Sequence, residues 1–475
     1  MADKVLRRTM FQTSRALEYF TERELGYQTG HSRHDWPQVI LKELMDNALD
    51  ACEDASVAPE IEVGSRCEKL LGAQLGQTYS LFSISVQDNG PGIEPGTIAK
   101  ILNFLTRTSD KEAYVSPTRG AQGNALKTVF AIPYVLSTAN PPEGISEIES
   151  QAVHHTIKVK LDAVRQEPRI EHEQAEIVKR PGCKVTVHLE NTCIPDAFQK
   201  GRFLQILQDY HLFNPHLTLT IQSDFQEEAP DYDPDNPRYV PIERYYKATN
   251  PGWERWKPND FTSPLWYSAE DLKKLILSHV ALAQDGGRDL TLREFVSQFR
   301  GLTSTAKQKA VTFRLPAVKH LSDFVDNGDA DSSLIGQLLL HMRSLTKPVT
   351  PEKLRVTGEA HFQKVFEGKN IKYAKKTGSD NDIPYVVEVA YVPDDTLDGV
   401  RFHFGLNFAP ASSDPLQGYR LTHETKKETF EGQGIKGLCA RYKVNSYDKV
   451  HVICHMTYPQ FRFKDRGKTI LEMGK

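Results

Sequence analysis

The sequence predicts an α+β protein of several domains, and three observations support this prediction. Residues 41–55 place apolar side chains at helical spacing, and residues 79–87 alternate between apolar and polar side chains as a strand does. Similar alternation returns between 154 and 190 and again in the last third of the chain. At 475 residues, 39% hydrophobic and 25% charged, the chain has the composition of a soluble globular protein with two to four domains.

Composition excludes several classes of protein. The formal net charge is −3, so no global positive field indicates a nucleic-acid binder, and any contact with DNA must be local. No apolar run is long enough to span a bilayer, and the N-terminal residues lack the apolar core of a signal peptide. We therefore expect a cytoplasmic protein without membrane contact. The six cysteines lack metal-ligand spacing and are expected to be reduced thiols.

The predicted helix at 41–55 carries the first candidate functional residues. Its apolar stripe is expected to comprise Leu44, Ala48, Ala51 and Ala55. On the neighbouring stripe, Glu43 and Asn47 lie one turn apart on the same face. A Glu can deprotonate a water, and an Asn oxygen beside it can complete the shell of a phosphate-bound Mg²⁺. Taken alone, this pair is more often part of a solvated acidic face.

The predicted strand at 79–87 leads directly into the turn DNGPGI, residues 88–93. Asp88 stands at the strand end. Gly90 and Gly92 allow a tight turn in which backbone can approach a ligand closely. The same hexapeptide elsewhere would be an ordinary turn.

A third feature, RGAQG at 119–123, precedes a helix expected to begin near Asn124. Free N–H groups at a helix start, with glycines leaving room, form an anion site suited to phosphates. An ordinary helix entry containing glycines is the alternative. The chain has neither a Walker P-loop nor a Rossmann fingerprint.

The order of these features resembles the GHKL ATPases, whose ATP-binding domain has the Bergerat fold. Within that family the sequence is most similar to the B subunits of type IIB topoisomerase VI and their bacterial relatives. The segments that carry the resemblance are RALEYF, ELMDNALDA, DNGPGI and RGAQG.

The resemblance implies a role for each matching residue, with ATP and Mg²⁺ as cofactors. Glu43 corresponds to the general base for water, and Asn47 corresponds to the Mg²⁺ ligand. Asp88 would accept the adenine amino group, while Gly90 and Gly92 would form the turn beneath the base.

Further nucleotide contacts implied by the resemblance come from a lid and a glycine loop. The lid residues would be Thr108, Ser109 and Lys111. The residues around the triphosphate would be Gly120, Gln122, Gly123 and Asn124. The chain departs from its relatives at Ala125, where they usually have a further glycine. A methyl group can be accommodated at a helical position.

The remaining elements follow from local patterns. Antiparallel strands are expected at 154–164, 169–178 and 182–190, then a helix at 196–210 and a strand at 217–225. In the last third we expect a helix at 332–345 and strands at 359–366, 384–393, 399–410 and 449–458.

These patterns and the resemblance together predict four regions. They are a GHKL ATPase domain with an N-terminal strap at 1–225, a Pro-rich acidic linker at 226–264, a helical module at 265–312 and a transducer domain at 313–475. The transducer would have a ribosomal-protein-like βαβ fold, and the helical module resembles a helix–two-turn–helix.

The helical module is expected to begin with a capping box of Ser268 and Asp271, and its second helix with Thr291 and Glu294. Five basic residues could contact DNA phosphates: Arg288, Arg293, Arg300, Lys307 and Lys309. A packing module with solvated basic side chains is an equally good interpretation, because acidic residues are interspersed among them.

Lys468 follows the last predicted strand. Its position matches the switch lysine of the related ATPases, which contacts the γ-phosphate, so the resemblance implies a catalytic role. Without the resemblance it would be interpreted as a solvated surface charge.

The expected function is that of an ATP-hydrolysing gate subunit whose nucleotide-driven homodimerisation drives DNA topology change. DNA and a separate topoisomerase VI A-like cleavage subunit are the expected partners. The chain ends seven residues after Lys468, without the long helix that docks the A subunit in relatives. The alternative is therefore a stand-alone GHKL switch or clamp in a bacterial DNA-processing or defence complex without strand passage. A chaperone-like ATPase is a third possibility.

Overall fold

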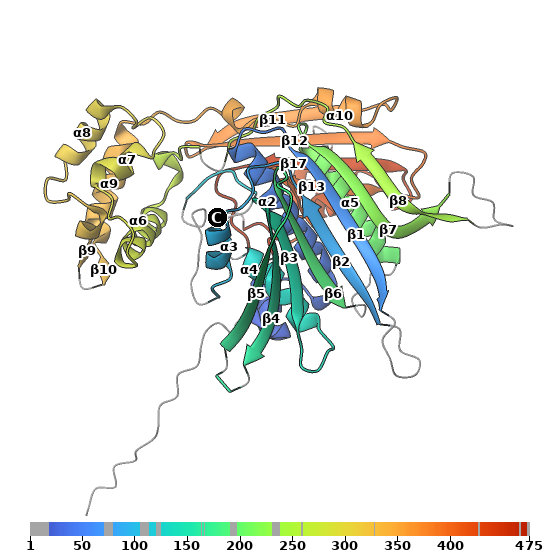
Figure 1. Ribbon diagram of the computed structural model, residues 1–475. Helices are drawn as coiled ribbons and strands as arrows, with labels where there is room; N and C mark the ends of the chain where they lie inside the picture. Colours follow the sequence, from blue (N-terminus) through green and yellow to red (C-terminus); the bar gives the residue numbers. More distant parts are fainter. Residues whose placement is uncertain are drawn as a thin grey trace, which may run out of the picture.

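The computed structural model describes residues 19–70, 79–104, 114–119, 125–162, 164–165, 167–190, 197–229, 238–257, 260–326, 328–425, 428–464 and 467–472. Across these residues the protein is α+β, as predicted, with two large sheets, two small two-stranded sheets and a separate helical unit (Figure 1). None of the described helices is long and apolar enough to cross a membrane.

The first sheet has eight strands in the order β5-β4-β3-β6-β2-β1-β7-β8. All neighbours are antiparallel except β1 and β7, which run parallel with Val63 opposite Ile221. The strands are β1 (Glu60–Leu70), β2 (Tyr79–Gln87), β3 (Gly144–Ser150), β4 (Val153–Asp162), β5 (Glu167–Glu176), β6 (Cys183–Glu190), β7 (Thr218–Glu228) and β8 (Tyr239–Tyr246).

Alternate residues of β3 and β6 are buried, because helices cover one face of this sheet (Figure 1). The helices are α1 (Glu22–Thr29), α2 (Trp36–Asp54), α3 (Pro95–Ile101), α4 (Ala125–Leu136) and α5 (Ala197–Phe213). Among them, α2 packs on β2, α4 on β3 and β6, and α5 on β7.

Helix α2 confirms the predicted helix but buries a wider stripe. Pro37 stands in its first turn, where the missing N–H costs nothing. Leu44 and Ala48 are buried as expected, whereas Ala51 is half-buried and Ala55 is the exposed C-cap. The predicted stripe was therefore wrong at its C-terminal end. Larger side chains fill the core instead, including Trp36, Ile40, Leu41, Met45 and Leu49.

The helical unit consists mainly of α6 (Ala269–Gln284), α7 (Leu292–Ser297), α8 (Thr305–Phe313) and α9 (Ser332–Ser344). Both predicted capping boxes are present, at the starts of α6 and α7. Its core joins Trp266, Phe295 and Phe299 to Ile335 and Leu338 of α9. This core continues beyond residue 312, where we had predicted the module to end. Likewise β8 lies within the predicted linker at 226–264, because its backbone pairs with β7.

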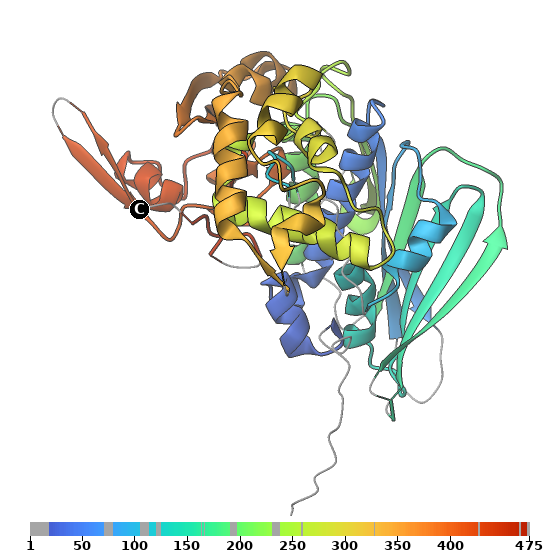
Figure 2. The ribbon, with the colours of Figure 1, turned by 90° about the vertical axis from the view of Figure 1, so that its left-hand side faces the viewer.

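The second sheet has the order β11-β12-β17-β13-β14. Its strands are β11 (Lys372–Asp380), β12 (Ile383–Pro393), β13 (Arg401–Leu406), β14 (Ala409–Pro410) and β17 (Val450–Thr457). Strands β13 and β17 are parallel and the other neighbours antiparallel. A small hairpin, β15 (Arg420–Glu424) and β16 (Thr429–Gln433), projects from the body beside α11 (Gly434–Arg441) (Figure 2).

One predicted strand, at 359–366, was wrong, since Glu359–Val365 forms helix α10. Phe362, Val365 and Phe366 face one apolar cluster, a spacing of three and four residues that suits a helix better than a strand. Gly358 introduces the helix with a φ of 90°, which only glycine adopts readily.

Helix α5 lies between the two sheets. Phe203, Leu207 and Tyr210 belong to the core of the first sheet, whereas Leu212 and Phe213 pack with Ala390, Val392 and Ile453 of the second. The two sheets therefore share a helix.

Candidate nucleotide site

Glu43 and Asn47 lie where the sequence placed them, one turn apart on α2. Glu43 is half-buried and Asn47 is exposed. Asp46, on the same helix, holds α2 in place against α5. It binds the Lys42 ammonium at 2.7 Å and accepts a 2.7 Å hydrogen bond from the hydroxyl of Tyr210 on α5. This arrangement holds a carboxylate and a carboxamide at the surface of a rigid helix.

Asp88 ends β2 as a buried carboxyl, 8% exposed. Its Oδ1 accepts hydrogen bonds from the backbone N–H of Gly90, at 2.8 Å, and of Cys183, at 3.3 Å. Burial raises the pKa of this carboxyl, while the two N–H groups act in the opposite direction. Among the described residues, both of these bonds end on Oδ1 and no hydrogen bond to Oδ2 is made.

Asn89 pins the DNGPGI turn to the end of α2, a role that was not expected from the sequence. Its Nδ2 donates to the carbonyl of Ala58 at 3.0 Å, and its Oδ1 accepts from the Glu60 N–H at 3.0 Å. The same oxygen accepts a hydrogen bond from the Cys52 thiol at 3.3 Å. The turn is therefore tied to the helix that carries Glu43 and Asn47.

Glycine is required at two positions around Asp88. Gly92 has a φ of 78°, and a Cβ there would lie 2.7 Å from the Ser150 hydroxyl. Gly182 has a φ of 80°, and its Cβ would lie 1.8 Å from the carbonyl oxygen of Asp88. Gly182 is far from the turn in sequence, so only the fold reveals its part.

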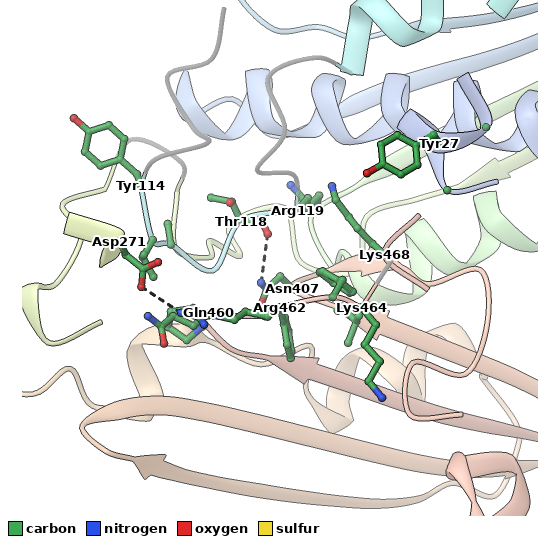
Figure 3. A pocket seen from close by; sticks show the side chains of 18 residues that line it. Tyr27, Tyr114, Thr118, Arg119, Asp271, Asn407, Gln460, Arg462, Lys464 and Lys468 are labelled. Carbon is green, nitrogen blue, oxygen red and sulfur yellow. Dashed lines mark hydrogen bonds and ion pairs between the residues drawn. The ribbon is translucent and has the colours of Figure 1, made fainter. Parts of the chain in front are cut away.

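A cavity of about 740 Å³ is lined by residues of α1, of the segment 114–119 and of the second sheet with the segment that follows β17. Its wall includes Arg119, Arg462, Lys464 and Lys468 (Figure 3). Lys468 is half-buried and has a φ of 55°. The described lining of this cavity includes Lys468 but not Glu43, Asn47 or Asp88.

The predicted lid and loop residues lie outside the described residues: Thr108, Ser109, Lys111, Gly120, Gln122, Gly123 and Asn124. Ala125, the departure from the glycine pattern, is the first residue of α4.

A buried cluster of charged side chains connects α2 to Arg119 and Arg255, and it was not predicted from the sequence. We define it by Asp50 and Glu53 of α2 together with Arg119 and Arg255. Both arginine side chains are fully buried. Burial alone would raise the pKa of Glu53, but the two guanidinium groups hold that pKa well below its usual range.

The basic residues of the helical unit mostly bond within the unit. Lys307 donates to the carbonyls of Gly301 and Leu345, at 2.8 and 2.7 Å, and Arg293 donates to Gln308 at 3.0 Å. Arg288 pairs with Glu294, and Arg300 stacks 5.4 Å from the Trp256 ring. These contacts support the packing interpretation of the module.

Known proteins are similar to part of this chain. The B subunit of type 2 DNA topoisomerase 6 from Archaeoglobus fulgidus is 28% identical over 184 residues, which cover 38% of this chain and 28% of that protein. Its counterpart from Natronomonas pharaonis is 31% identical over 152 residues, which cover 32% of this chain and 17% of that protein. The counterpart from Methanosarcina barkeri is 31% identical over 195 residues, which cover 40% of this chain and 29% of that protein. The matches span less than a third of these relatives.

Among solved structures, the ATPase region of Saccharomyces cerevisiae topoisomerase II bound to ICRF-187 has a TM-score of 0.36 and 12% identity. The match covers 92% of this chain and 77% of that one. A second structure of the same ATPase region gives a TM-score of 0.35 and 11% identity. No protein-family model matches the chain. From the sequence matches, the chain is a distant homologue of the B subunit of type 2 DNA topoisomerase 6.

Proposed function

We propose that this protein is a GHKL ATPase that binds and hydrolyses ATP with Mg²⁺. The observation that carries the proposal is the buried Asp88 carboxyl, whose Oδ1 is occupied by two backbone N–H groups while Oδ2 faces no described donor. An oriented carboxylate oxygen in a buried turn is suited to accept an adenine amino group.

The roles of the other residues follow from their chemistry. Glu43 would orient and deprotonate the attacking water, and the exposed Asn47 would hold Mg²⁺ through its side-chain oxygen. Bound Mg²⁺ would neutralise phosphate charge. Thr108, Ser109, Lys111 and the loop residues Gly120, Gln122, Gly123 and Asn124 are proposed to enclose the phosphates, and Lys468 to contact the γ-phosphate as a point charge.

Nucleotide binding by Asp88→Asn tests the adenine contact. The substitution keeps the size of the side chain, but its amide cannot replace both carboxylate oxygens as acceptors. A buried hydrogen bond left unmade costs about 1–3 kcal/mol, so affinity for ATP should fall about 5- to 150-fold by titration calorimetry. Asp162→Asn makes the same chemical change at the half-buried last residue of β4 and should bind as the wild type does.

Glu43→Gln separates binding from chemistry in the same assay. It should bind ATP with nearly unchanged affinity while hydrolysis falls about 10²- to 10⁴-fold, because an amide cannot take the proton from water. Wild-type affinity in Asp88→Asn, or wild-type turnover in Glu43→Gln, would contradict the proposed site.

We further propose that the ATPase acts as a gate subunit in DNA topology change, with an A-like cleavage subunit as partner. The homology to the B subunit of topoisomerase 6 supports this role. The alternative is a clamp in a DNA-processing or defence complex. Relaxation of supercoiled plasmid by this chain together with an A-like subunit distinguishes the gate from the clamp.

A further inference from the structure

The buried ion cluster joins three parts of the chain that are distant in sequence. Arg119 donates from Nη1 to Asp50, at 3.0 Å, and from both Nη atoms to the two oxygens of Glu53, at 2.7 and 2.6 Å. Arg255 donates from Nε to Glu53 at 2.7 Å and from Nη2 to Asp50 at 2.8 Å. Two guanidinium groups thus face two carboxylates, so the cluster is electrically balanced without water.

Two residues of the segment NPH, at 214–216, complete this cluster. Asn214 Oδ1 accepts from Arg119 Nη2 at 2.5 Å. His216 donates from Nε2 to Glu53 at 2.9 Å, and burial lowers the pKa of His216. Every hydrogen-bonding direction of the Glu53 carboxylate is therefore met by a buried donor.

The cluster extends into the second sheet through the tight turn between β13 and β14. The carbonyl of Phe408 accepts from Asn214 Nδ2 at 2.9 Å and from Arg119 Nε at 3.4 Å. Asn407 and Phe408 have φ angles of 49° and 67°, a conformation that points this carbonyl into the cluster only at the cost of backbone strain.

Asn407 connects this turn to the segment before Arg119 and to the segment after β17. Its Nδ2 donates to the carbonyl of Thr118 at 3.3 Å (Figure 3). The same Nδ2 donates to the carbonyl of Tyr458 at 3.0 Å. Its Oδ1 accepts the N–H of Tyr458 at 2.9 Å. Tyr458 follows β17 and begins the stretch that leads to Lys468, and Arg119 immediately precedes Gly120 in the sequence.

We propose that Arg119, Asn214 and Asn407 form a latch. This latch couples nucleotide binding, at the first sheet and the helices that cover it, to the position of the second sheet. The inference rests on the proposed ATP site and adds its means of communication. Arg119, Asn214 and Asn407 are positioning residues, because they act through α2 and the Phe408 turn and not on the nucleotide.

The segment before Arg119 anchors the latch to the helical unit as well. The Val115 N–H donates to the Tyr267 hydroxyl at 2.9 Å, and Thr262 donates to the Val115 carbonyl at 2.6 Å. Residues 114–119 are thus bonded both to the ion cluster, through Arg119, and to the helical unit, through Val115.

Hydrogen exchange of the full-length protein, with and without Mg²⁺ and a non-hydrolysable ATP analogue, tests the latch. In the wild type the analogue should slow exchange about 5- to 150-fold at amides of 404–411 and 457–464, the range typical of coupled sites. Asn407→Gly keeps the positive φ but removes the side-chain bonds. It should bind the analogue within about threefold of the wild type yet lose this remote protection.

Asn381→Gly is the matched control, because Asn381 is exposed, has a φ of 48° and lies in another turn of the same sheet. It should retain the protection. If Asn407→Gly fails to fold, Asn214→Ser replaces it: the short, uncharged side chain removes the bond to the Phe408 carbonyl and leaves the charges of the cluster balanced.

The outcomes separate the two proposals. Equal protection in Asn407→Gly, or in its replacement, and the wild type would overturn the latch and leave the ATP site intact. Failure of the wild type to bind the analogue at all would overturn the proposed function, and the latch as its means of coupling with it.

Discussion

At the scale of single residues, the ion cluster shows how strongly burial changes the contribution of an ion pair to stability. Arg255 and Arg244 each bond carboxylate oxygens through two nitrogens, Arg255 one oxygen each of Glu53 and Asp50 and Arg244 both oxygens of Glu227. Arg255 is fully buried between Asp50 and Glu53, whereas Arg244 pairs with Glu227 on the surface. Water can replace the partner of Arg244 but has no access to the carboxylates beside Arg255.

Arg255→Met should therefore lower the free energy of unfolding by about 3–5 kcal/mol, because it leaves buried negative charge without its partner. Arg244→Met removes an exposed pair and should cost less than about 1 kcal/mol. Urea unfolding of the two variants beside the wild type measures the difference. Equal losses would mean that the buried cluster is not held by its charges.

At the scale of elements, α5 is used on two sides. Gln205, Asp209 and Phe213 repeat every four residues and all face the second sheet: Gln205 bonds the Phe402 carbonyl at 3.0 Å, Asp209 bonds His403 at 2.5 Å, and Phe213 stacks on His455. The opposite stripe belongs to the first core. The end of α5 also meets α10, since His361 donates from Nε2 to the Leu212 carbonyl at 2.9 Å.

This contact predicts a loss of stability in acid. Burial lowers the pKa of His361 to about 3, against about 6.5 in an unfolded chain. Between these values the unfolded chain binds a proton that the folded protein does not. The contribution is therefore complete above about pH 6.5 and declines by about 1.4 kcal/mol per pH unit as the pH falls.

Urea unfolding between pH 4.5 and 7.5 should show a shallower acid slope for His361→Gln, whose amide can still donate to Leu212 but does not titrate. His34→Gln, at an exposed position, is the control. An unchanged slope in His361→Gln would show that His361 is not buried as a neutral ring.

The elements that could be predicted from sequence are those with a clear local period. Helix α2, strands β2 and β6 and the two capping boxes were predictable in this way. Strand β8 was missed because Pro241 and exposed polar residues hide an edge strand. Helix α10 was taken for a strand because its apolar run is short.

In the candidate site, too, the residues in short local motifs were predictable and those with distant partners were not. Glu43, Asn47 and Asp88 stand in short motifs, so their positions could be predicted from the sequence. Their proposed roles in nucleotide chemistry stay predictions. Glu53, Arg255 and Gly182 could not be found, because their partners lie far away in the chain. Arg255, for example, is 205 residues from Asp50. Pairing at such separation depends on the fold and leaves no periodic signal.

At the scale of the whole molecule, the proposed gate requires a change in assembly. If ATP and Mg²⁺ favour one conformation that closes two chains on each other, nucleotide must shift the monomer–dimer equilibrium by its differential affinity for the closed state.

Light scattering with Mg²⁺ and a non-hydrolysable ATP analogue should show the molar mass doubling for the wild type. Asn47→Ala should stay monomeric, because it lacks the proposed Mg²⁺ ligand, while Asn445→Ala, at another exposed position, should dimerise. A wild type that binds the analogue and remains monomeric would exclude the gate and favour a switch that acts through another protein.

The shared helix α5 also bears on how this architecture can be inherited. A recombination break between the two sheets would leave Leu212 and Phe213 without the apolar partners that bury them. Such a fragment would expose an apolar surface and tend to aggregate with other chains. The two sheets are thus best regarded as one heritable module, whereas the helical unit, with a core of its own, is the part that evolution could exchange.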